Sequence, residues 1–226
     1  MTARTIFVVD DDKSVRNSVA RLLRSAGYPV ETYPSAEAFM ASPHGNGPGC
    51  LVLDIRMPGS TGLDLQERLL GSNSKLAVVF ITGHGDIPTS VRAIKKGAID
   101  FLAKPFDDVD LLAAVAQALS KSTHDHAVQI ETDSINTRLG ALTPREREVL
   151  GLVVTGLLNK QIADQIGTTE KTVKVHRGRV MEKMQVRSLA ELVQISVRIG
   201  IQGERPIFPS SLSAADPSLL RRLTLP

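Results

Sequence analysis

Short apolar runs alternate with segments of helical periodicity over the first half of the chain. Apolar and β-branched runs of strand length lie at 6–9, 28–33, 51–54, 77–81 and 98–103. In the intervening segments apolar residues recur every three or four positions, which predicts helices at 13–24, 36–40, 62–70, 86–96 and from 107 to near Ser120. Strands that alternate with helices favour a parallel sheet covered on both faces. We therefore predict a five-stranded, parallel, doubly wound α/β domain over residues 1–120.

A different pattern follows this domain. Residues 121–140 are polar and lack strong periodicity, which indicates a linker, or a helix extension that frays into one. Next come four helical segments without an intervening strand, at 144–155, 159–166, 170–184 and 189–197. We assign residues 141–202 to an all-α four-helix unit and expect residues 203–226, which are rich in Pro and Ser, to form a flexible tail.

The helix ends in the second half support this division. Thr143 is predicted as an N-cap, Pro144 as the first helical residue and Glu146 as the acid of a capping box. Gly156 ends that helix, and Gly167 turns the chain sharply between the second and third helices. A helix, a glycine-containing turn and a basic helix are typical of a helix-turn-helix unit.

The composition is that of an ordinary globular protein, with 23% charged and 42% hydrophobic residues in a chain of 226. No apolar run approaches the roughly 20 residues that span a bilayer, and we identify no secretion signal. We expect a cytoplasmic protein without a membrane partner. The single cysteine, Cys50, excludes an intrachain disulfide and is predicted to lie in the core.

Charge is divided unevenly along the chain. Residues 1–120 contain 12 Lys and Arg against 13 Asp and Glu, a balance of −1, whereas residues 141–202 contain 10 against 6, a balance of +4. A near-neutral part joined to a basic part indicates that the second part binds a polyanion.

Polar side chains end the predicted strands, where the carboxyl edge of a parallel sheet forms a crevice for ligands. They are Asp10, Asp11, Asp54, Thr82 and Lys104. Carboxylates a few ångströms apart repel one another, and a hard divalent ion such as Mg²⁺ (or Mn²⁺) relieves that repulsion. The alternative is that each residue caps a strand or helix end; the coincidence of four strand ends disfavours it.

A carboxylate beside such an ion can attack a phosphoryl donor and form an acyl phosphate. The ammonium of Lys104 would neutralise the phosphoryl oxygens, and the hydroxyl of Thr82 would donate to one of them. For Asp54 alone, a turn-capping role after a core strand is an equal alternative.

These positions resemble the two-component receiver domain. The resemblance rests on the motifs Asp10-Asp11, Asp54-Ile55-Arg56-Met57-Pro58-Gly59, Thr82-Gly83 and Lys104-Pro105-Phe106. It implies a flavodoxin-like fold, phosphorylation of Asp54, and a metal ion held by Asp11, Asp54 and the backbone carbonyl of Arg56, with Asp10 acting through water. It also implies a switch role for Thr82, Lys104 and the rotating aromatic Phe101, and a Pro105 that is usually cis.

The predicted helix 170–184 has two distinct faces. Val173, Val180 and Met184 recur at spacings of seven and four and are expected to pack inward. The opposite face holds Lys171, Lys174, Val175, Gly178 and Glu182. Basic side chains there can reach phosphates or guanine edges, and Val175 can touch a thymine methyl group. A merely solvated face with scattered lysines is the alternative.

Residues 141–202 resemble the DNA-binding domain of the LuxR and NarL type. The resemblance rests on the segments 142–150, 159–163 and 172–177. It implies base contacts near Lys174 and Val175 and a dimerisation surface on the last helix. It implies phosphate contacts from Thr172, His176, Arg179, Asn159 and Lys160.

The two halves together resemble a response regulator of the FixJ/NarL family, a DNA-binding transcriptional regulator. We expect a sensor histidine kinase to phosphorylate Asp54, and the phosphorylated chain to form a homodimer that binds two half-sites on double-stranded DNA. We expect no enzyme activity and assign no catalytic residue. The alternatives are a phosphorylation-independent transcription factor with a vestigial pocket and a metal-dependent phosphohydrolase. The second alternative lacks a general acid at Arg56, two residues after its nucleophile.

Overall fold

The computed structural model describes residues 4–43, 47–72, 74–83 and 87–201. The chain divides into two compact units, and the division falls after Glu131. The predicted tail at 203–226 and the predicted start of a helix at residue 86 lie outside the described residues.

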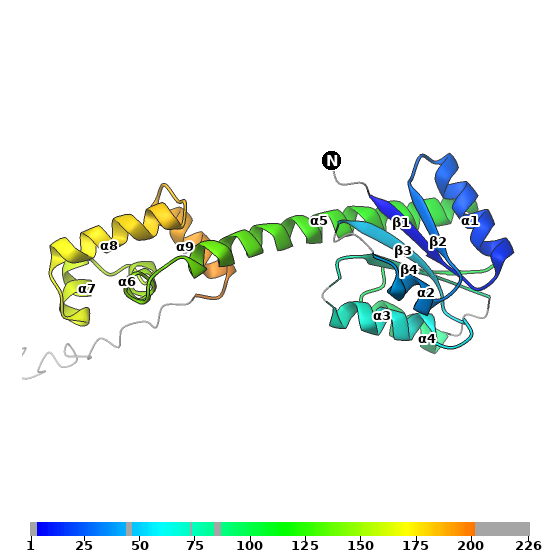
Figure 1. Ribbon diagram of the computed structural model, residues 1–226, viewed down its shortest axis with the longest axis horizontal. Helices are drawn as coiled ribbons and strands as arrows, with labels where there is room; N and C mark the ends of the chain where they lie inside the picture. Colours follow the sequence, from blue (N-terminus) through cyan, green and yellow to red (C-terminus); the bar gives the residue numbers. More distant parts are fainter. Residues whose placement is uncertain (1–3, 44–46, 73, 84–86, 202–226) are drawn as a thin grey trace, which may run out of the picture. The chain divides into compact units, whose positions relative to one another are not determined.

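The first unit contains the predicted five-stranded parallel sheet, and its strand order is β2-β1-β3-β4-β5. Figure 1 labels β1 to β4 of this sheet. Its strands are β1 (Thr5–Val9), β2 (Val30–Tyr33), β3 (Gly49–Asp54), β4 (Ala77–Thr82) and β5 (Asp100–Ala103). The helices that follow them are α1 (Lys13–Ser25), α2 (Ala36–Ala41), α3 (Gly62–Gly71), α4 (Ile87–Lys95) and α5 (Asp108–Gly140).

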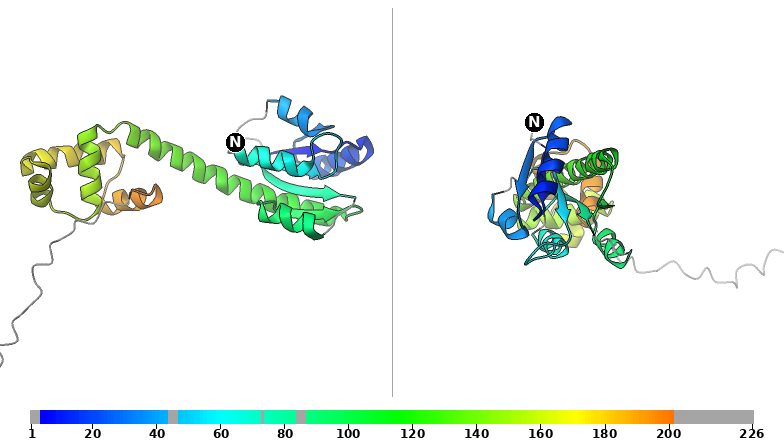
Figure 2. Two further views of the ribbon diagram at one scale, coloured as in Figure 1. Left: turned by 90° about the horizontal axis from the view of Figure 1, so that it is seen from below. Right: turned by 90° about the vertical axis from the view of Figure 1, so that its right-hand side faces the viewer.

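Helices cover both faces of this sheet (Figure 2), and each face has its own hydrophobic core. Alternate residues of a strand point to opposite faces, so Phe7 joins the core beneath α2, α3 and α4, whereas Ile6 joins the core beneath α1 and α5. Cys50 is fully buried in the second core, as predicted, and burial raises the pKa of its thiol. The double covering leaves the carboxyl edge of the sheet as the place where polar side chains gather.

Two strands begin later than predicted, β2 at Val30 and β5 at Asp100. The reason is that the chain is still bonded to the preceding helix: the backbone N–H groups of Tyr28 and Ala98 donate to helix carbonyls at Leu23 and Ala93. These bonds close helix ends that the period-two strand pattern does not reveal.

The prediction that the last helix of the first domain ends near Ser120 is wrong, because α5 continues to Gly140. Ser122 is fully buried, and its Oγ donates to the carbonyl of Lys75 (2.6 Å) and accepts from the N–H of Gly49 (3.0 Å). Further along, Ile135 is buried in the core of the second unit. Residues 121–140 are therefore helical, and both ends of this stretch are held by contacts that lie far away in sequence.

The second unit contains the four predicted helices. They are α6 (Pro144–Val154), α7 (Asn159–Ile166), α8 (Glu170–Lys183) and α9 (Leu189–Arg198). Thr143 caps α6 and forms the predicted capping box with Glu146. Gly167 ends α7 with a φ of +65°, the left-handed conformation that glycine adopts without steric cost. The tight turn that it makes leads directly into α8.

An ion pair joins the start of α6 to the end of α8. Lys183 Nζ lies 2.6 Å from the carboxylate of Glu146, which is almost fully buried and also accepts from the backbone N–H of Thr143. The hydrogen bond from Lys183 lowers the pKa of Glu146 to about 2. Arg138, near the end of α5, donates to the carbonyl of Met184, just after α8, at 2.7 Å. The helix that carries the basic face is thus fixed at its carboxyl end.

Among the residues that the structure describes, no helix combines the length and apolar character needed to cross a membrane.

Candidate functional site

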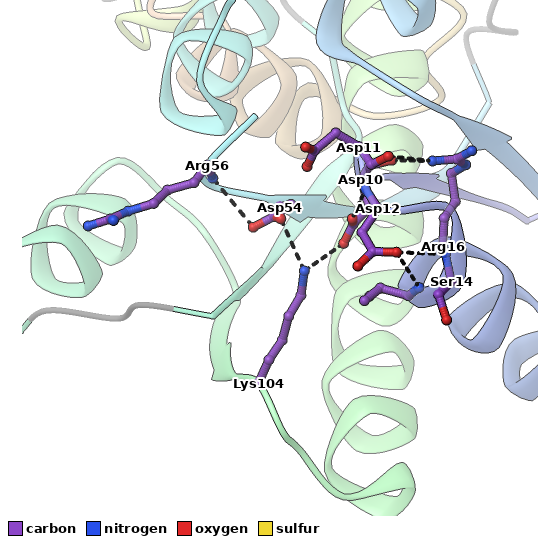
Figure 3. A network of polar contacts seen from close by, with 9 residues as sticks. Asp10, Asp11, Asp12, Ser14, Arg16, Asp54, Arg56 and Lys104 are labelled. Atoms are coloured by element: carbon purple, nitrogen blue, oxygen red, sulfur yellow. Dashed lines mark hydrogen bonds and ion pairs between the residues drawn. The ribbon is translucent and has the colours of Figure 1, made fainter. Parts of the chain in front are cut away.

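Polar residues gather where four strands end at the carboxyl edge of the sheet, and Figure 3 shows Asp10, Asp54 and Lys104 among them. Asp10 follows β1, Asp54 ends β3, Thr82 ends β4 and Lys104 follows β5. Lys104 Nζ lies 2.7 Å from Oδ2 of Asp10 and 3.0 Å from Oδ2 of Asp54. The predicted cluster of carboxylates and ammonium is therefore present, with one lysine bridging two acids.

Burial controls the electrostatics of this bridge. Removal of Asp10 from water raises the pKa of its carboxyl group, and the hydrogen bond and charge of Lys104 offset only part of that rise. Burial by itself would lower the pKa of Lys104, but the hydrogen bonds and the negative charges of Asp10 and Asp54 together outweigh burial and raise that pKa. The amine therefore stays protonated at neutral pH and faces the end of β3 with a full positive charge.

Asp11 completes a group of three carboxylates. One oxygen from each of Asp10, Asp11 and Asp54 lies within 4.8 Å of the others. Asp10 and Asp54 are buried, whereas Asp11 is exposed, so the cluster is open to solvent on one side. Hard oxygen ligands that reach one point fit an ion such as Mg²⁺, which keeps several waters and therefore needs an open side.

The loop after β3 keeps its backbone close to Asp54. The N–H of Arg56 lies 3.4 Å from Oδ1 of Asp54, and the Arg56 side chain is exposed and extends away from the carboxylates (Figure 3). The backbone of Arg56, which is predicted to supply a metal ligand, therefore lies beside the carboxylate of Asp54.

Thr82 and Phe101 lie on the β4–β5 side of the site. Thr82 is fully buried, and its carbonyl accepts from the backbone N–H of Lys104 at 2.7 Å. Phe101 is partly buried against the core beneath α2, α3 and α4. The Lys104–Pro105 bond is cis, in agreement with the expectation for Pro105.

The sequence patterns missed two residues that shape this site. A Cβ at Gly62 would lie 2.3 Å from the carbonyl oxygen of Asp54, so only glycine lets α3 start this close to β3. Arg16 donates through Nη1 to the carbonyls of Asp10 (2.6 Å) and Asp11 (3.3 Å). The sequence contains one indication that Arg16 has a role outside the helix: it is a cation in the first turns of α1, where the macrodipole favours acids.

The third acid of the Asp10-Asp11-Asp12 run has a separate role. Asp12 caps α1, and its Oδ1 accepts from the N–H groups of Ser14 (2.7 Å) and Val15 (3.4 Å). Its own N–H donates to Oδ1 of Asp10 at 2.8 Å. The run therefore ends in a helix cap, which helps to hold Asp10 in place.

In the second unit, α8 divides into the two predicted faces. Val173, Val180 and Met184 are buried, as expected. The predicted DNA-contact residues Lys171, Lys174, Val175 and Arg179 are exposed, and Thr172 and His176 are half-buried. The hydroxyl groups of Thr172 and Thr169 lie 2.9 Å apart at the start of the helix. This face has the basic side chains and the apolar Val175 that a DNA groove can accept.

The start of α7 contacts α8 through a pair that sequence reasoning missed. Arg177 Nη1 donates to Oδ1 of Asn159 at 3.2 Å, and both residues are half-buried, whereas Lys160 is exposed. Because Arg177 takes the amide oxygen of Asn159, it leaves the two N–H donors of that amide for other acceptors. The two residues are 18 positions apart, so no local pattern indicates their contact.

Two family descriptions match the two parts of the chain. Residues 6–116 match the response regulator receiver domain, and residues 140–196 match the bacterial regulatory proteins of the luxR family.

Two bacterial proteins illustrate the similarity over most of the chain. Nodulation protein W of Bradyrhizobium diazoefficiens is 46% identical over 200 residues, which is 88% of each protein. The transcriptional regulatory protein FixJ of Azorhizobium caulinodans is 43% identical over 87% of this chain and 93% of its own length.

Solved structures agree with these alignments. The structure of the response regulator StyR matches with a TM-score of 0.78 and 48% sequence identity. The match covers 87% of this chain and 100% of the StyR chain. Full-length FixJ from B. japonicum gives a TM-score of 0.52 with 38% identity, over 89% of this chain and 99% of that one.

Proposed function

The chain belongs to the response regulators that join a receiver domain to a LuxR-family DNA-binding domain, and we propose that phosphorylation of Asp54 by a sensor histidine kinase controls it. It is a DNA-binding transcriptional regulator of a two-component system. We assign residues 1–120 to the receiver, 121–140 to a linker that the end of α5 makes helical, 141–202 to the DNA-binding domain and 203–226 to a tail. The second family consists of bacterial regulatory proteins, and bacterial DNA lies in the cytoplasm, so we propose a cytoplasmic location.

Asp54 is the proposed nucleophile. One of its carboxylate oxygens bonds to the phosphorus of the donor while the bond between phosphorus and the donor breaks, which leaves an acyl phosphate on Asp54. Lys104 Nζ, 3.0 Å from Oδ2 of Asp54, is close enough to pair with an oxygen of the transferred group. The Thr82 hydroxyl would donate to a second oxygen.

The proposed metal ion is Mg²⁺ or Mn²⁺. Asp11, Asp54 and the Arg56 carbonyl would hold it directly, and Asp10 would act through a bound water. The three carboxylates within 4.8 Å of one another support this assignment. When bound, such an ion neutralises charge on the phosphoryl oxygens.

The bridge from Lys104 to Asp10 and Asp54 is the observation that carries this proposal. The ammonium that balances these two buried carboxylates also lies where a phosphoryl dianion would require a countercharge. The test is incubation of the full chain with acetyl phosphate and Mg²⁺, followed by mass spectrometry of the intact protein. We expect the mass of one phosphoryl group on the wild type and none on Asp54→Asn. An unmodified wild type, or equal modification of the variant, would refute the assignment.

The phosphoryl group is proposed to act by shifting a pre-existing equilibrium. Thr82 would move toward the new oxygens and Phe101 would rotate inward, which changes the surface formed by α4 and β5. Two chains would then join, and their two DNA-binding domains would occupy two half-sites with avidity set by effective concentration. Sizing chromatography before and after acetyl phosphate measures this: wild type is expected to become dimeric and Asp54→Asn to stay unchanged.

The exposed basic face of α8 is proposed to enter the major groove. Lys174 and Val175 would contact bases, and Lys171 on the same face would reach phosphates or guanine edges. The remaining residues would contact phosphates: Thr172, His176 and Arg179 of α8, with Asn159 and Lys160 of α7. Phosphate contacts make the affinity depend on salt, by about 0.9 log unit per contact for each log unit of salt. Titration of a labelled duplex at several salt concentrations therefore counts the contacts.

Two alternatives are distinguished by the same materials. A phosphorylation-independent transcription factor would form the same oligomer with and without acetyl phosphate, and the paired carboxylates and Lys104 argue against it. A phosphohydrolase would release phosphate repeatedly from a chromogenic substrate with Mg²⁺; Arg56 stands where a general acid would be needed, so we expect no turnover.

A further inference from the structure

Arg16 donates hydrogen bonds to the backbone of the turn that contains Asp10 and Asp11, which we call the acidic turn. It is half-buried on the first turns of α1, and its Nη1 donates to the carbonyl of Asp10 at 2.6 Å and to that of Asp11 at 3.3 Å (Figure 3). One guanidinium nitrogen thus reaches the backbone of both neighbouring acids. The contact is to carbonyls and leaves the carboxylates available on the other side of the turn.

The carboxylates of this turn differ in how firmly they are held. Asp10 is fully buried, and both of its carboxylate oxygens accept hydrogen bonds, from the N–H of Asp12 and from Lys104. The side chain of Asp11 is exposed, although it belongs to the group of three carboxylates. A ligand on an exposed turn loses conformational freedom when it binds a metal ion, unless its backbone is already fixed. Arg16 fixes that backbone.

The position of Arg16 is unfavourable for the helix itself. Asp12 is the N-cap of α1 and Arg16 is the fourth residue of that helix, near the end where the macrodipole disfavours cations. The helix itself gains no dipole stabilisation from a positive charge there, and the interactions of Arg16 are its hydrogen bonds to the carbonyls of Asp10 and Asp11.

We propose that Arg16 is a positioning residue for the divalent metal ion: it holds the Asp10–Asp11 backbone so that the carboxylate of Asp11 is set for coordination. The inference rests on the metal site of the proposed function. It assigns a role to a residue that touches neither the metal ion nor the phosphoryl group.

Electrostatics and positioning predict opposite signs for the loss of Arg16. Removal of a nearby positive charge reduces repulsion of a divalent cation and strengthens its binding. Loss of a group that orients a metal ligand weakens binding by about 10- to 100-fold. A purely structural role would lower the melting temperature and leave the metal affinity of the folded protein unchanged.

The experiment uses Mn²⁺ alone as the probe, with the free ion measured by its electron paramagnetic resonance signal in solutions of the full chain. The variants are Arg16→Met and, as a charge-matched control on the same helix, the exposed Arg21→Met. Arg16→Lys retains the charge but replaces the planar fork by a single ammonium. Asp11→Asn gives the background from other binding positions. Circular dichroism at the titration temperature records that each variant is folded.

We expect Arg16→Met to bind Mn²⁺ at least about tenfold more weakly than wild type. Arg16→Lys should also bind Mn²⁺ more weakly than wild type. Arg21→Met should bind Mn²⁺ at least as tightly as wild type. If Arg16→Met is not folded, the comparison of Arg16→Lys with wild type decides. Equal or tighter binding by the folded Arg16 variants would overturn the positioning role. A wild type that binds no more Mn²⁺ than Asp11→Asn would instead overturn the metal site itself and this inference with it.

Discussion

Replacement of Lys104 by Met should destabilise the receiver unit at neutral pH and do so much less in acid. The variant keeps the length of the side chain but removes the ammonium that bridges Asp10 and Asp54. Asp10 then stays fully buried without its countercharge and beside a second carboxylate. The expected loss comes from these uncompensated charges and not from a cavity.

The distances set the size of the effect. At 2.7 and 3.0 Å each pair has a gross Coulomb attraction of about 6 kcal/mol at an effective dielectric constant of about 20. Most of this is offset by the cost of taking the three charges out of water, and removal of one member of a buried pair costs about 3–5 kcal/mol. Because the Lys104 side chain remains 18% exposed, we expect a loss at or just below the lower end of that range, about 2–3 kcal/mol at pH 7.

The pH dependence follows from the pKa of Asp10. Its pKa is already raised in the folded wild type, chiefly by burial, and loss of Lys104 removes the interactions that lower it. A carboxyl group whose pKa is higher in the folded than in the unfolded protein lowers stability once the unfolded chain ionises. Its penalty is absent below the unfolded pKa of 3.8, grows as pH rises from there to the folded pKa, and is complete above the folded pKa. The deficit of the variant should therefore shrink as pH falls from 7 toward 4.

Tyrosine fluorescence makes the measurement selective. The chain has two tyrosines and no tryptophan, and both tyrosines, Tyr28 and Tyr33, belong to the first unit. Urea unfolding of the full chain, followed by this signal, should show a midpoint about 1–2 M lower for Lys104→Met at pH 7. As a control, Lys121→Met breaks an exposed pair with Asp125 and should cost less than about 1 kcal/mol.

An unchanged midpoint at pH 7 would show that the bridge contributes no net stability. A deficit of the same size at pH 7 and at pH 4.5 would show that the loss does not arise from ionised carboxylates. Either result would show that Lys104 does not act as the countercharge of the buried carboxylates.

Three further results are expected from single replacements elsewhere. Gly62→Ala places a Cβ 2.3 Å from the carbonyl of Asp54 and should lower stability by about 1–3 kcal/mol and slow phosphorylation by acetyl phosphate; unchanged urea midpoint and rate would contradict this. Glu146→Gln should lower the melting temperature of the second unit, measured by circular dichroism, at pH 7. Because the pKa of Glu146 is lowered from 4.5 to about 2, its contribution is complete above 4.5 and the difference from wild type should disappear as pH falls toward 2. Arg177→Gln and Asn159→Ala should each weaken binding of a mixed-sequence duplex, measured by fluorescence anisotropy, and the double variant should lose less than the sum because Arg177 orients Asn159; additive losses would mean that the two act independently.

Much of the fold follows from local patterns. Alternation along β1 sends Ile6 and Phe7 to opposite cores, and the spacing of Val173 and Val180 along α8 identifies its buried face. These assignments depend only on the period of each helix or strand, which can be recognised from neighbouring residues in the sequence. The same reasoning assembled Asp10, Asp54 and Lys104, because parallel strands present their carboxyl ends at one edge.

The local patterns could not predict contacts between segments that lie far apart in the sequence. The length of α5 depends on Ser122 bonding to Gly49, 73 residues away, and the polar composition around Ser122 indicates a linker when read by itself. Gly62 looks like one more turn glycine until the carbonyl of Asp54 is placed against it. Local propensity is a weak determinant wherever a distant group supplies the hydrogen bond or excludes a side chain.

The amino-acid sequence alone determined the two-part organisation, the order of helices and strands, the buried faces and the acids and lysine of the pocket, because periodicity and strand-end chemistry are local properties. Only the tertiary structure decided that Arg16 holds the acidic turn, that Gly62 admits α3 against β3 and that Arg177 takes the oxygen of Asn159. These roles depend on directions and distances of a few ångströms between packed side chains, and such directions exist only after the elements have come together.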